Sequence, residues 1–235
     1  MEITTLESLE NISKNSLYSA GVMQYSIAHS FNILSRYANF IDVLELGPAE
    51  GVMTHFISNR AQQLTLVEGS QLFCEALSND FPDACVIHSL FESFEPATRF
   101  DTIVMGHVLE HVDDPVALLK RVKSWLSPNG IVFCSVPNAM SVHRQAAVIM
   151  GMLETESALN DLDRHHGHKR VYYPELLRQH FIQAGFRIDS YGGYWLKALS
   201  NKQLEAVCDE SMVKGFMLLG ERYPDIAAEI YVVAR

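Results

Sequence analysis

The sequence has few cysteines and no closely paired ones. Cys74, Cys85, Cys134 and Cys208 are scattered along 235 residues without a CxxC pair. Three of the four lie inside apolar segments, where small buried thiols are common. The sequence therefore does not indicate a disulfide-stapled or cysteine-zinc scaffold, and we expect reduced cysteines in a cytoplasmic protein.

Long apolar runs are also missing. No stretch reaches the length that a bilayer-spanning helix needs. The opening residues, "MEITTLESLENISKNS", lack the basic region and following apolar block of a secretion signal. We therefore expect no membrane partner and a cytoplasmic location.

Positive charge is scarce as well. The formal net charge is -10, and the longest basic cluster, residues 164–170, is short and rich in histidine. Nucleic-acid binding draws much of its affinity from clustered Lys and Arg, so a nucleic-acid partner is not expected. The oligomeric state is left open, with a homodimer as one alternative.

The chain has enough apolar residues to bury one substantial core. Hydrophobic residues make up 48% of the composition, which excludes collagen-like and disordered chains. From residue 41 onward, apolar strand-like segments alternate with helical ones, as in "IDVLEL", "LTLVEG", "ACVIHS", "DTIVMGH" and "IVFCSV". Such alternation predicts an α/β fold in which helices flank a parallel sheet on both faces.

We expect a single domain with four parts. Residues 1–39 form an N-terminal helical cap, in which Leu17 to Tyr37 has helical spacing of apolar residues. Residues 40–137 form the ligand-binding half, 138–173 an inserted lid, and 174–235 the second half. The last part contains a predicted helix from Lys202 to Leu219.

The first strand runs into a glycine-containing turn, "VLELGPAEG". Gly47 and Gly51 permit a backbone that approaches a ligand closely. The usual dinucleotide fingerprint has a third glycine between them, but Ala49 and Glu50 stand in this loop. A diphosphate would meet a carboxylate there, whereas a cationic ligand would be favoured by it. Glu45, inside the strand, also suits an ammonium or sulfonium group, or else it bonds loop amides.

The second strand ends with another carboxylate, Glu68, in "LTLVEGS". An acid at this place accepts hydrogen bonds from both ribose hydroxyls in nucleoside-binding sheets. Together the two strand ends predict a nucleoside that carries a positive charge.

The order and spacing of four segments resemble the class I S-adenosylmethionine-dependent methyltransferases that act on small molecules. The segments are "VLELGPAEG", "LVEGS", "FDTIVMGHVLEHVDDP" and "LSPNGIVFCSVPN", with a weaker match in "HGHKRVYYPELLRQHFIQAGF". They cover roughly residues 40–140. The resemblance implies a Rossmann-like, doubly wound α/β fold: a mostly parallel seven-stranded sheet with helices on both faces and an antiparallel last strand. It also implies S-adenosylmethionine as cofactor and S-adenosylhomocysteine as product.

The resemblance also implies roles for individual residues. The loop from Gly47 to Gly51, with Ala49, would hold the methionine part, and Glu68 with Gly69 the ribose. Ser89, Leu90 and Phe91 would flank adenine, and Gly106 and His107 would line the methionine side. Glu45, beside the glycine turn, and Tyr25, on the leading helix, are further expected cofactor contacts, although Tyr25 equally suits that helix's buried stripe. Ala49 and Ser89 depart from the family, which often has glycine and aspartate there.

Histidines are the candidate catalytic groups. His168 matches a histidine often found in related sequences and is the first choice of base, with His111 and His165 as further candidates. For His111, a structural role or a role in shaping the substrate pocket is an equal alternative. Glu110 beside His111 can tune an imidazole, although adjacent helical residues point in different directions. A metal is not expected, because metal sites normally combine well-separated elements with carboxylate support.

Methyl transfer from a sulfonium depends mainly on alignment of acceptor, methyl carbon and sulfur. A hydroxyl acceptor gains from a histidine base. We therefore expect O-methylation of a small molecule, such as a sugar or glycan precursor or a specialised metabolite. The alternatives are N-methylation of a small amine, a nicotinamide oxidoreductase on the same fold, and a non-catalytic cofactor-binding partner subunit.

Overall fold

The computed structural model describes residues 9–10, 13–14 and 21–235. Seven strands form one sheet in the order β3-β2-β1-β4-β5-β7-β6. The strands are β1 (Asp42–Leu46), β2 (Gln63–Glu68), β3 (Cys85–His88), β4 (Phe100–Gly106), β5 (Leu126–Pro137), β6 (Ile188–Tyr194) and β7 (Glu229–Ala234). The pairs from β3 to β5 are parallel, whereas β7 runs antiparallel to both β5 and β6. The predicted sheet, including its antiparallel last strand, is confirmed.

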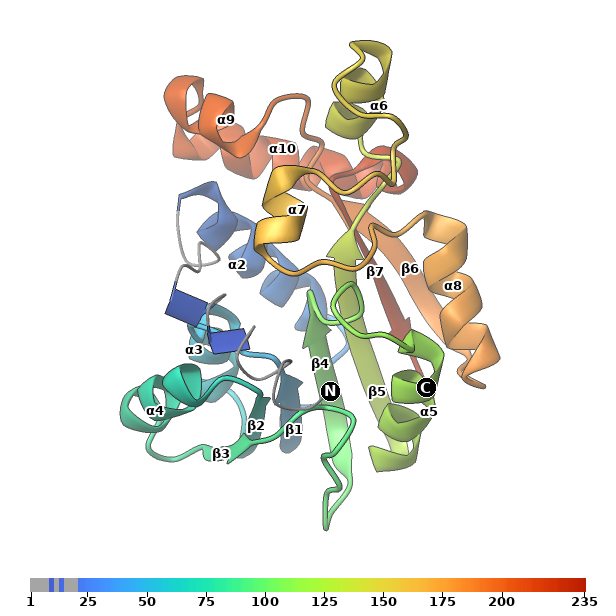
Figure 1. Cartoon of the computed structure of the whole chain (residues 1–235). Coiled ribbons are helices and arrows are strands. Elements are labelled where there is room, and N and C mark those ends of the chain that lie inside the picture. The colour runs from blue at the N-terminus through green and yellow to red at the C-terminus, as the bar shows by residue number, and fades with distance from the viewer. Residues whose placement is uncertain (1–8, 11–12, 15–20) are drawn as a thin grey trace.

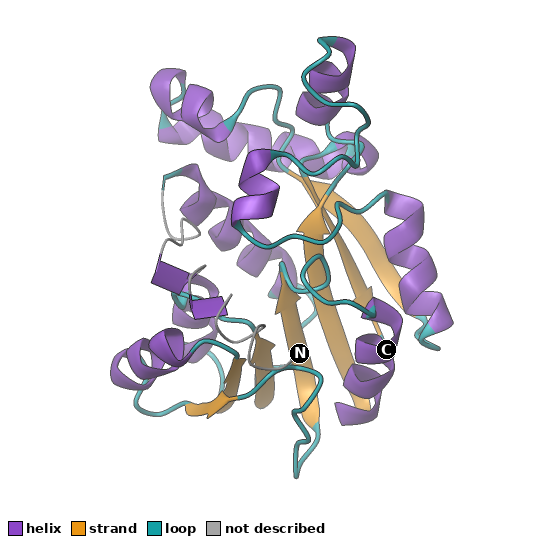
Figure 2. Cartoon of the chain, in the orientation of Figure 1, coloured by secondary structure: helices purple, strands orange, loops and turns teal. Residues whose placement is uncertain are grey.

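Helices cover both faces of this sheet (Figures 1 and 2). One face packs against α5 (Pro115–Trp125) and α8 (Pro174–Gln183). The other packs against α2 (Val22–Leu34), α3 (Val52–Ser58), α4 (Gln71–Asp80), α9 (Asn201–Val207) and α10 (Glu210–Arg222).

The two cores explain why the strands are apolar along their whole length. Within β1, Leu44 belongs to the core under α5, and its neighbour Val43 to the core under α2. Successive strand residues point to opposite faces, so a sheet covered twice needs apolar side chains at both. Polar residues inside such strands therefore stand out.

The segment from 138 to 173 lies over the carboxyl ends of the central strands. It contains α6 (Val142–Ile149) and α7 (Asp161–His165). In Figure 1, α7 crosses above the tips of β4 and β5. Asn138 anchors the start of the segment, because its amide nitrogen donates to the carbonyls of Asp225 (3.0 Å) and Ala227 (2.8 Å).

Two predicted elements have different bounds in the structure. The single helix predicted from Lys202 to Leu219 is two helices, α9 and α10, followed by the short 3-10 helix η1 (Pro224–Ile226). The break occurs because Asp209 caps a new helix, with its carboxylate accepting from the Met212 amide at 2.9 Å. The leading helix, predicted from Leu17, is described only from Val22, and its first residues lie outside the described part. Among the described residues, no helix combines the length and apolar character that crossing a membrane requires.

Candidate active site

A cavity of about 1060 Å³ of empty space, partly open to solvent, lies at the carboxyl ends of β1, β2 and β4. It is the place where open α/β sheets bind ligands. Eight predicted site residues line it: Glu45, Gly47, Ala49, Glu68, Phe91, Gly106, His107 and His111.

The loop after β1 has three residues in the left-handed backbone region. Their φ angles are 66° at Gly47, 49° at Ala49 and 76° at Gly51. A residue with a side chain is strained at such a φ angle, so Ala49 holds a backbone conformation that glycine adopts more readily.

Glu68 ties this loop to the end of β2. Its two carboxylate oxygens accept from the amides of Ser70 (2.9 Å) and Ala49 (3.2 Å). Burial raises its pKa, although both hydrogen bonds act in the opposite direction. The carboxylate is 7% exposed and lines the cavity, so its remaining lone pairs face the ligand space.

Glu45 bonds a helix rather than the loop amides. The Thr54 hydroxyl of α3 donates to its Oε2 at 2.7 Å. Burial raises the pKa of Glu45 to about 8. The group is therefore mostly protonated at neutral pH.

His107 follows β4 and is held between two buried carboxylates. Its φ is 56°, its Nδ1 lies 3.1 Å from Glu110 Oε1, and its Nε2 lies 3.5 Å from Glu229 Oε2. Burial opposes a charge on the ring, but Glu229 and Glu110 outweigh it and raise the pKa of His107 to about 9. Burial would raise the pKa of Glu110, yet the bond to His107 lowers it to about 2. This turn therefore carries a charged imidazolium at neutral pH.

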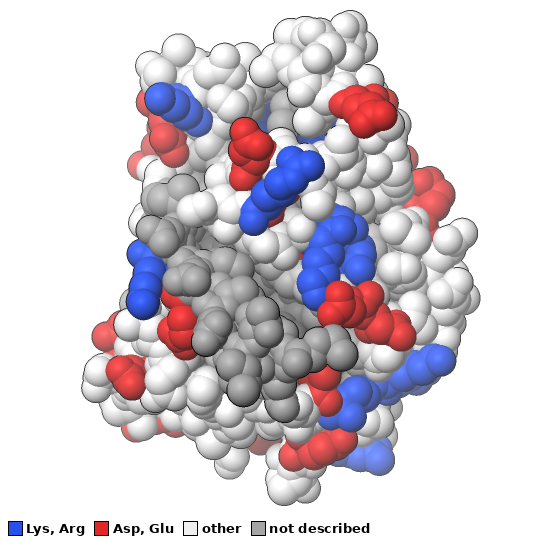
Figure 3. All heavy atoms as spheres, viewed as in Figure 1, with Lys and Arg blue, Asp and Glu red and all other residues white. Residues whose placement is uncertain are grey.

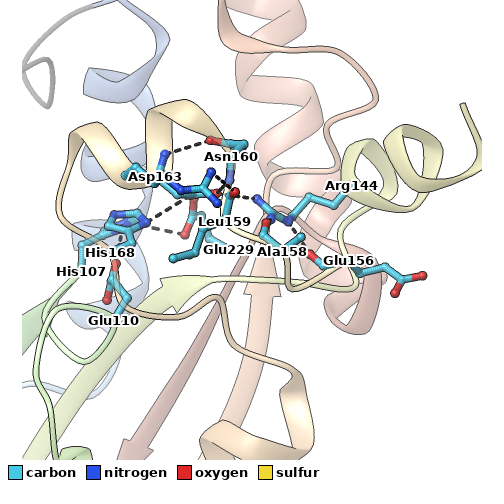
Figure 4. A network of polar contacts seen from close by, with 11 residues as sticks. His107, Glu110, Arg144, Glu156, Ala158, Leu159, Asn160, Asp163, His168 and Glu229 are labelled. Carbon is cyan, nitrogen blue, oxygen red and sulfur yellow. Dashed lines mark hydrogen bonds and ion pairs between the residues drawn. The ribbon is translucent and has the colours of Figure 1, made fainter. Parts of the chain in front are cut away.

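Four further histidines gather between this turn and α7. The ring centroids of His111 and His168 are 4.8 Å apart, and those of His166 and His168 are 5.9 Å apart. His168 Nδ1 hydrogen-bonds Asp163 Oδ1 at 3.1 Å, and Arg144 pairs with the other oxygen of Asp163 at 3.2 Å (Figure 4). Burial lowers the pKa of both His111 and His166 to about 4, so both rings are neutral at pH 7.

Comparison with known proteins decides the family. The profile of the methyltransferase domain family matches residues 20–191. The chain belongs to this family. The predicted family is thus confirmed.

Curated relatives agree with this assignment. The ubiquinone biosynthesis O-methyltransferase of Idiomarina loihiensis is 27% identical over 145 residues, which are 58% of each chain. This methyltransferase spans 40 to 58% of the length of the first three curated relatives that it matches.

Two solved structures show the same fold over the whole chain. DhpI in its "DhpI-SAM-HEP complex" is 17% identical with a TM-score of 0.65, and covers 99% of this chain and 96% of its own. The N-methyltransferase NodS of Bradyrhizobium japonicum, with S-adenosylhomocysteine, is 14% identical with a TM-score of 0.62, over 100% and 97%.

Other predicted site residues of this chain do not line the cavity. Gly51 is the N-cap of α3, and the Ser89 hydroxyl donates to the Leu90 carbonyl at 2.9 Å. His165 is exposed, and His168 stands behind His111 and His166. The predicted residues outside the lining are Gly51, Gly69, Ser89, Leu90, Tyr25, His165 and His168.

Sequence reasoning missed two residues of the site. Glu229 opens an otherwise apolar strand, which is the same signal that drew attention to Glu45, but its partner His107 is 122 positions away in the chain. His166 has no individual signal in the sequence, where it stands within the histidine-rich cluster of residues 164–170. In the structure it is the histidine of the 138–173 segment that lines the cavity.

Proposed function

We propose that this methyltransferase transfers a methyl group from S-adenosylmethionine to a hydroxyl of a small molecule. One observation carries the proposal. The cavity is lined by the carboxyl groups of Glu45, Glu50 and Glu68, and by no Lys or Arg among the described residues. The charged His107 ring also lines it, but Glu110 and Glu229 offset that charge. Glu45, neutral in the empty cavity, would ionise beside a cation, so the lining suits a sulfonium and opposes a diphosphate.

The cofactor would lie along the ends of the first three strands. The methionine part would sit beside the loop of Gly47 and Ala49 and near Gly106 and His107. Glu68 would accept from the ribose hydroxyls with the lone pairs that its two amide bonds leave. Ser89, Leu90 and Phe91 would flank adenine, and Phe91 already packs toward Gly47, with its Cζ 3.2 Å from where a Cβ would stand. The DhpI structure is a complex with SAM and the NodS structure a complex with S-adenosylhomocysteine, which supports this choice of cofactor.

Neutral histidines in the cavity support an oxygen acceptor. A hydroxyl must lose a proton during methyl transfer, whereas an amine lone pair attacks without a base. His111 and His166 line the cavity and are neutral at pH 7, so either can take that proton. His168 would act behind them, and His165 is the least favoured of the predicted catalytic histidines because it is exposed.

The acceptor would be a free small molecule such as a sugar, a glycan precursor or a specialised metabolite. On the face shown in Figure 3, positive and negative side chains alternate over the described residues, without a broad basic patch for a polyanion. The segment 138–173 would close the acceptor side as a lid, since it contributes His166 to the cavity. The four cysteines are free, which suits the proposed cytoplasmic location.

Calorimetry with S-adenosylmethionine, S-adenosylhomocysteine and NAD tests the cofactor. We expect micromolar binding of the first two and none of NAD, and the reverse result would replace this proposal with an oxidoreductase. A panel of paired hydroxy and amino compounds, followed by mass spectrometry of a transferred labelled methyl group, tests the acceptor. Methylation of the amines alone, as the name of NodS describes for that protein, would contradict the oxygen acceptor. Binding without transfer to any acceptor would favour a non-catalytic subunit.

A further inference from the structure

Three metal-ligating side chains meet beside the cavity. One carboxylate oxygen of Glu110 and one ring nitrogen each of His111 and His168 all lie within 4.8 Å of one another. Glu110 and His111 follow β4, and His168 follows α7, so the group joins two separate parts of the chain. Figure 4 shows Glu110 and His168. We propose that Glu110, His111 and His168 bind a divalent transition-metal ion.

The two histidines are oriented as metal ligands usually are. A ligating imidazole normally gives its other ring nitrogen to a carboxylate or a backbone carbonyl. His168 Nδ1 bonds Asp163, which turns Nε2 away from that carboxylate, and His111 bonds the backbone of Gly167. Asp163 is itself fixed by the guanidinium of Arg144 at 3.2 Å and by the Asn160 amide at 3.0 Å. Both rings therefore have a fixed plane before any ion arrives.

Glu110 adds the carboxylate that such a site requires. The residue is 0% exposed, and its Oε1 bonds His107 at 3.1 Å. No described residue hydrogen-bonds its buried Oε2. A buried carboxylate oxygen without a donor costs free energy, and a cation at the centre of the group would remove that cost. Metal sites normally combine well-separated elements with carboxylate support, and the sequence indicated neither. Both features are present in the group of Glu110, His111 and His168.

The ligand set indicates the class of ion. Two imidazoles and one carboxylate are the three-ligand pattern of open zinc sites and of related transition metals, whereas Mg²⁺ and Ca²⁺ prefer oxygen ligands alone. His111 also lines the cavity, so an open coordination position would face the acceptor space. If that position holds an acceptor oxygen, this role rests on the proposed function. Metal binding by the three residues does not depend on it. With His111 as a ligand, His166 is the cavity histidine that remains to take a proton.

Calorimetric titration of the chelator-treated full chain with Zn²⁺ tests the site, and Co²⁺ serves as a spectroscopic probe of coordination. We expect one ion per chain with micromolar or tighter affinity, and a Co²⁺ absorption typical of four- or five-fold coordination. His168→Ala and Glu110→Gln should each weaken binding at least tenfold, and Asp163→Asn by about tenfold through loss of ring orientation. His55→Ala, on the exposed side of α3, is the matched control and should bind as the parent does.

Equal affinity in the parent and in His168→Ala, or no binding by the parent, would overturn the site. Thermal melting of each variant checks folding, and Asp163→Asn provides a second variant that removes no ligand. Cofactor binding is measured separately on the same samples. Zinc uptake without S-adenosylmethionine binding would leave the metal site standing and remove the proposed function, while the opposite result would remove the metal site alone.

Discussion

Three buried glutamates near the cavity differ in charge because their neighbours differ. Glu45 has only a hydroxyl partner, and burial raises its pKa to about 8. Glu110 has the His107 ring beside it, and its pKa falls to about 2. Glu68 is intermediate: burial raises its pKa, while hydrogen bonds from two backbone amides stabilise its ionised form. A single residue type thus provides a neutral acid, an anion for a cation partner and a ribose ligand.

Replacing Glu68 tests the ribose assignment. In Glu68→Ala the cofactor loses an acceptor for its ribose hydroxyls, and the Ala49 amide loses its partner. We expect the calorimetric dissociation constant for S-adenosylmethionine to rise at least tenfold, equivalent to about 1.4 kcal/mol. Glu92→Ala, in the exposed turn after Phe91, is the control and should bind normally. Affinity of Glu68→Ala within twofold of the parent would refute the assignment.

Removing the Thr54 hydroxyl tests the state of Glu45. Thr54→Val keeps the shape of the side chain but leaves the buried carboxyl without its donor. We expect the free energy of unfolding in urea to fall by about 1–2 kcal/mol. Thr98→Val, at an exposed position, should change it by less than about 0.5 kcal/mol. Equal stability of the two variants would mean that Glu45 draws no support from α3.

At the scale of elements, α10 is fixed to the end of β6 through its backbone. The amides of Trp195 and Leu196 donate to the carbonyls of Met217 (3.1 Å) and Phe216 (2.8 Å). A Cβ at Gly220 would lie 2.2 Å from the Trp195 nitrogen. The helix therefore approaches the strand more closely than any side chain at residue 220 allows.

Two glycines of α10 make a matched pair of variants. Gly220→Ala pushes the helix from the strand, and we expect a loss of about 3 kcal/mol or more in the free energy of unfolding. Gly215→Ala meets nothing within 4 Å, and it should gain up to about 1 kcal/mol from better helix propensity. Denaturant midpoints of both variants measure the difference. A neutral Gly220→Ala would show that the close contact does not limit the packing.

Which elements the sequence predicts depends on how local their signals are. The strands from "IDVLEL" to "IVFCSV" were predictable because apolar runs between turns are a local pattern. The break between α9 and α10 was missed because apolar residues keep helical spacing on both sides of Asp209. The Asp209 side chain caps the N-terminus of α10 and so starts a new helix there. The histidine-rich stretch was visible in the sequence, but the arrangement of its side chains was not. Asp163 pairs with Arg144 and with His168 only when the segment folds.

At the scale of the whole molecule, the cavity combines residues from both halves of the chain. The β1 loop and Glu68 were predictable, since each stands at the end of its own strand. The pairing of His107 with Glu229 was not, because β7 must first insert beside β5 before the two meet. Such long-range pairs depend on the order of the strands in the sheet, which a single sequence indicates only indirectly.

Stability should depend on pH through histidines that are buried as neutral rings. Burial, with Lys197 and Arg144 nearby, lowers the pKa of His143 from its ordinary value of 6.5 to about 3. The unfolded chain therefore binds a proton at this residue before the folded chain does. The contribution of His143 to stability is present above about pH 6.5 and is lost as the pH falls toward 3.

The variant His143→Gln isolates this effect. Relative to the parent, its free energy of unfolding should rise as the pH falls from 7 to 4, by a difference on the order of 2 kcal/mol. Urea denaturation of both proteins at several pH values measures the difference. A constant offset across that range would contradict a depressed pKa for His143.

The position of β7 also has a consequence for biosynthesis. This strand lies between β5 and β6 in the sheet, although it follows both in the chain, and all its residues are buried. Ribosomes release β6 well before β7, so β6 has no partner until residues 229–234 have left the exit tunnel. A nascent chain stalled before that point should expose an unpaired sheet edge and attract chaperones, whereas release of those few residues should let the sheet close in one step.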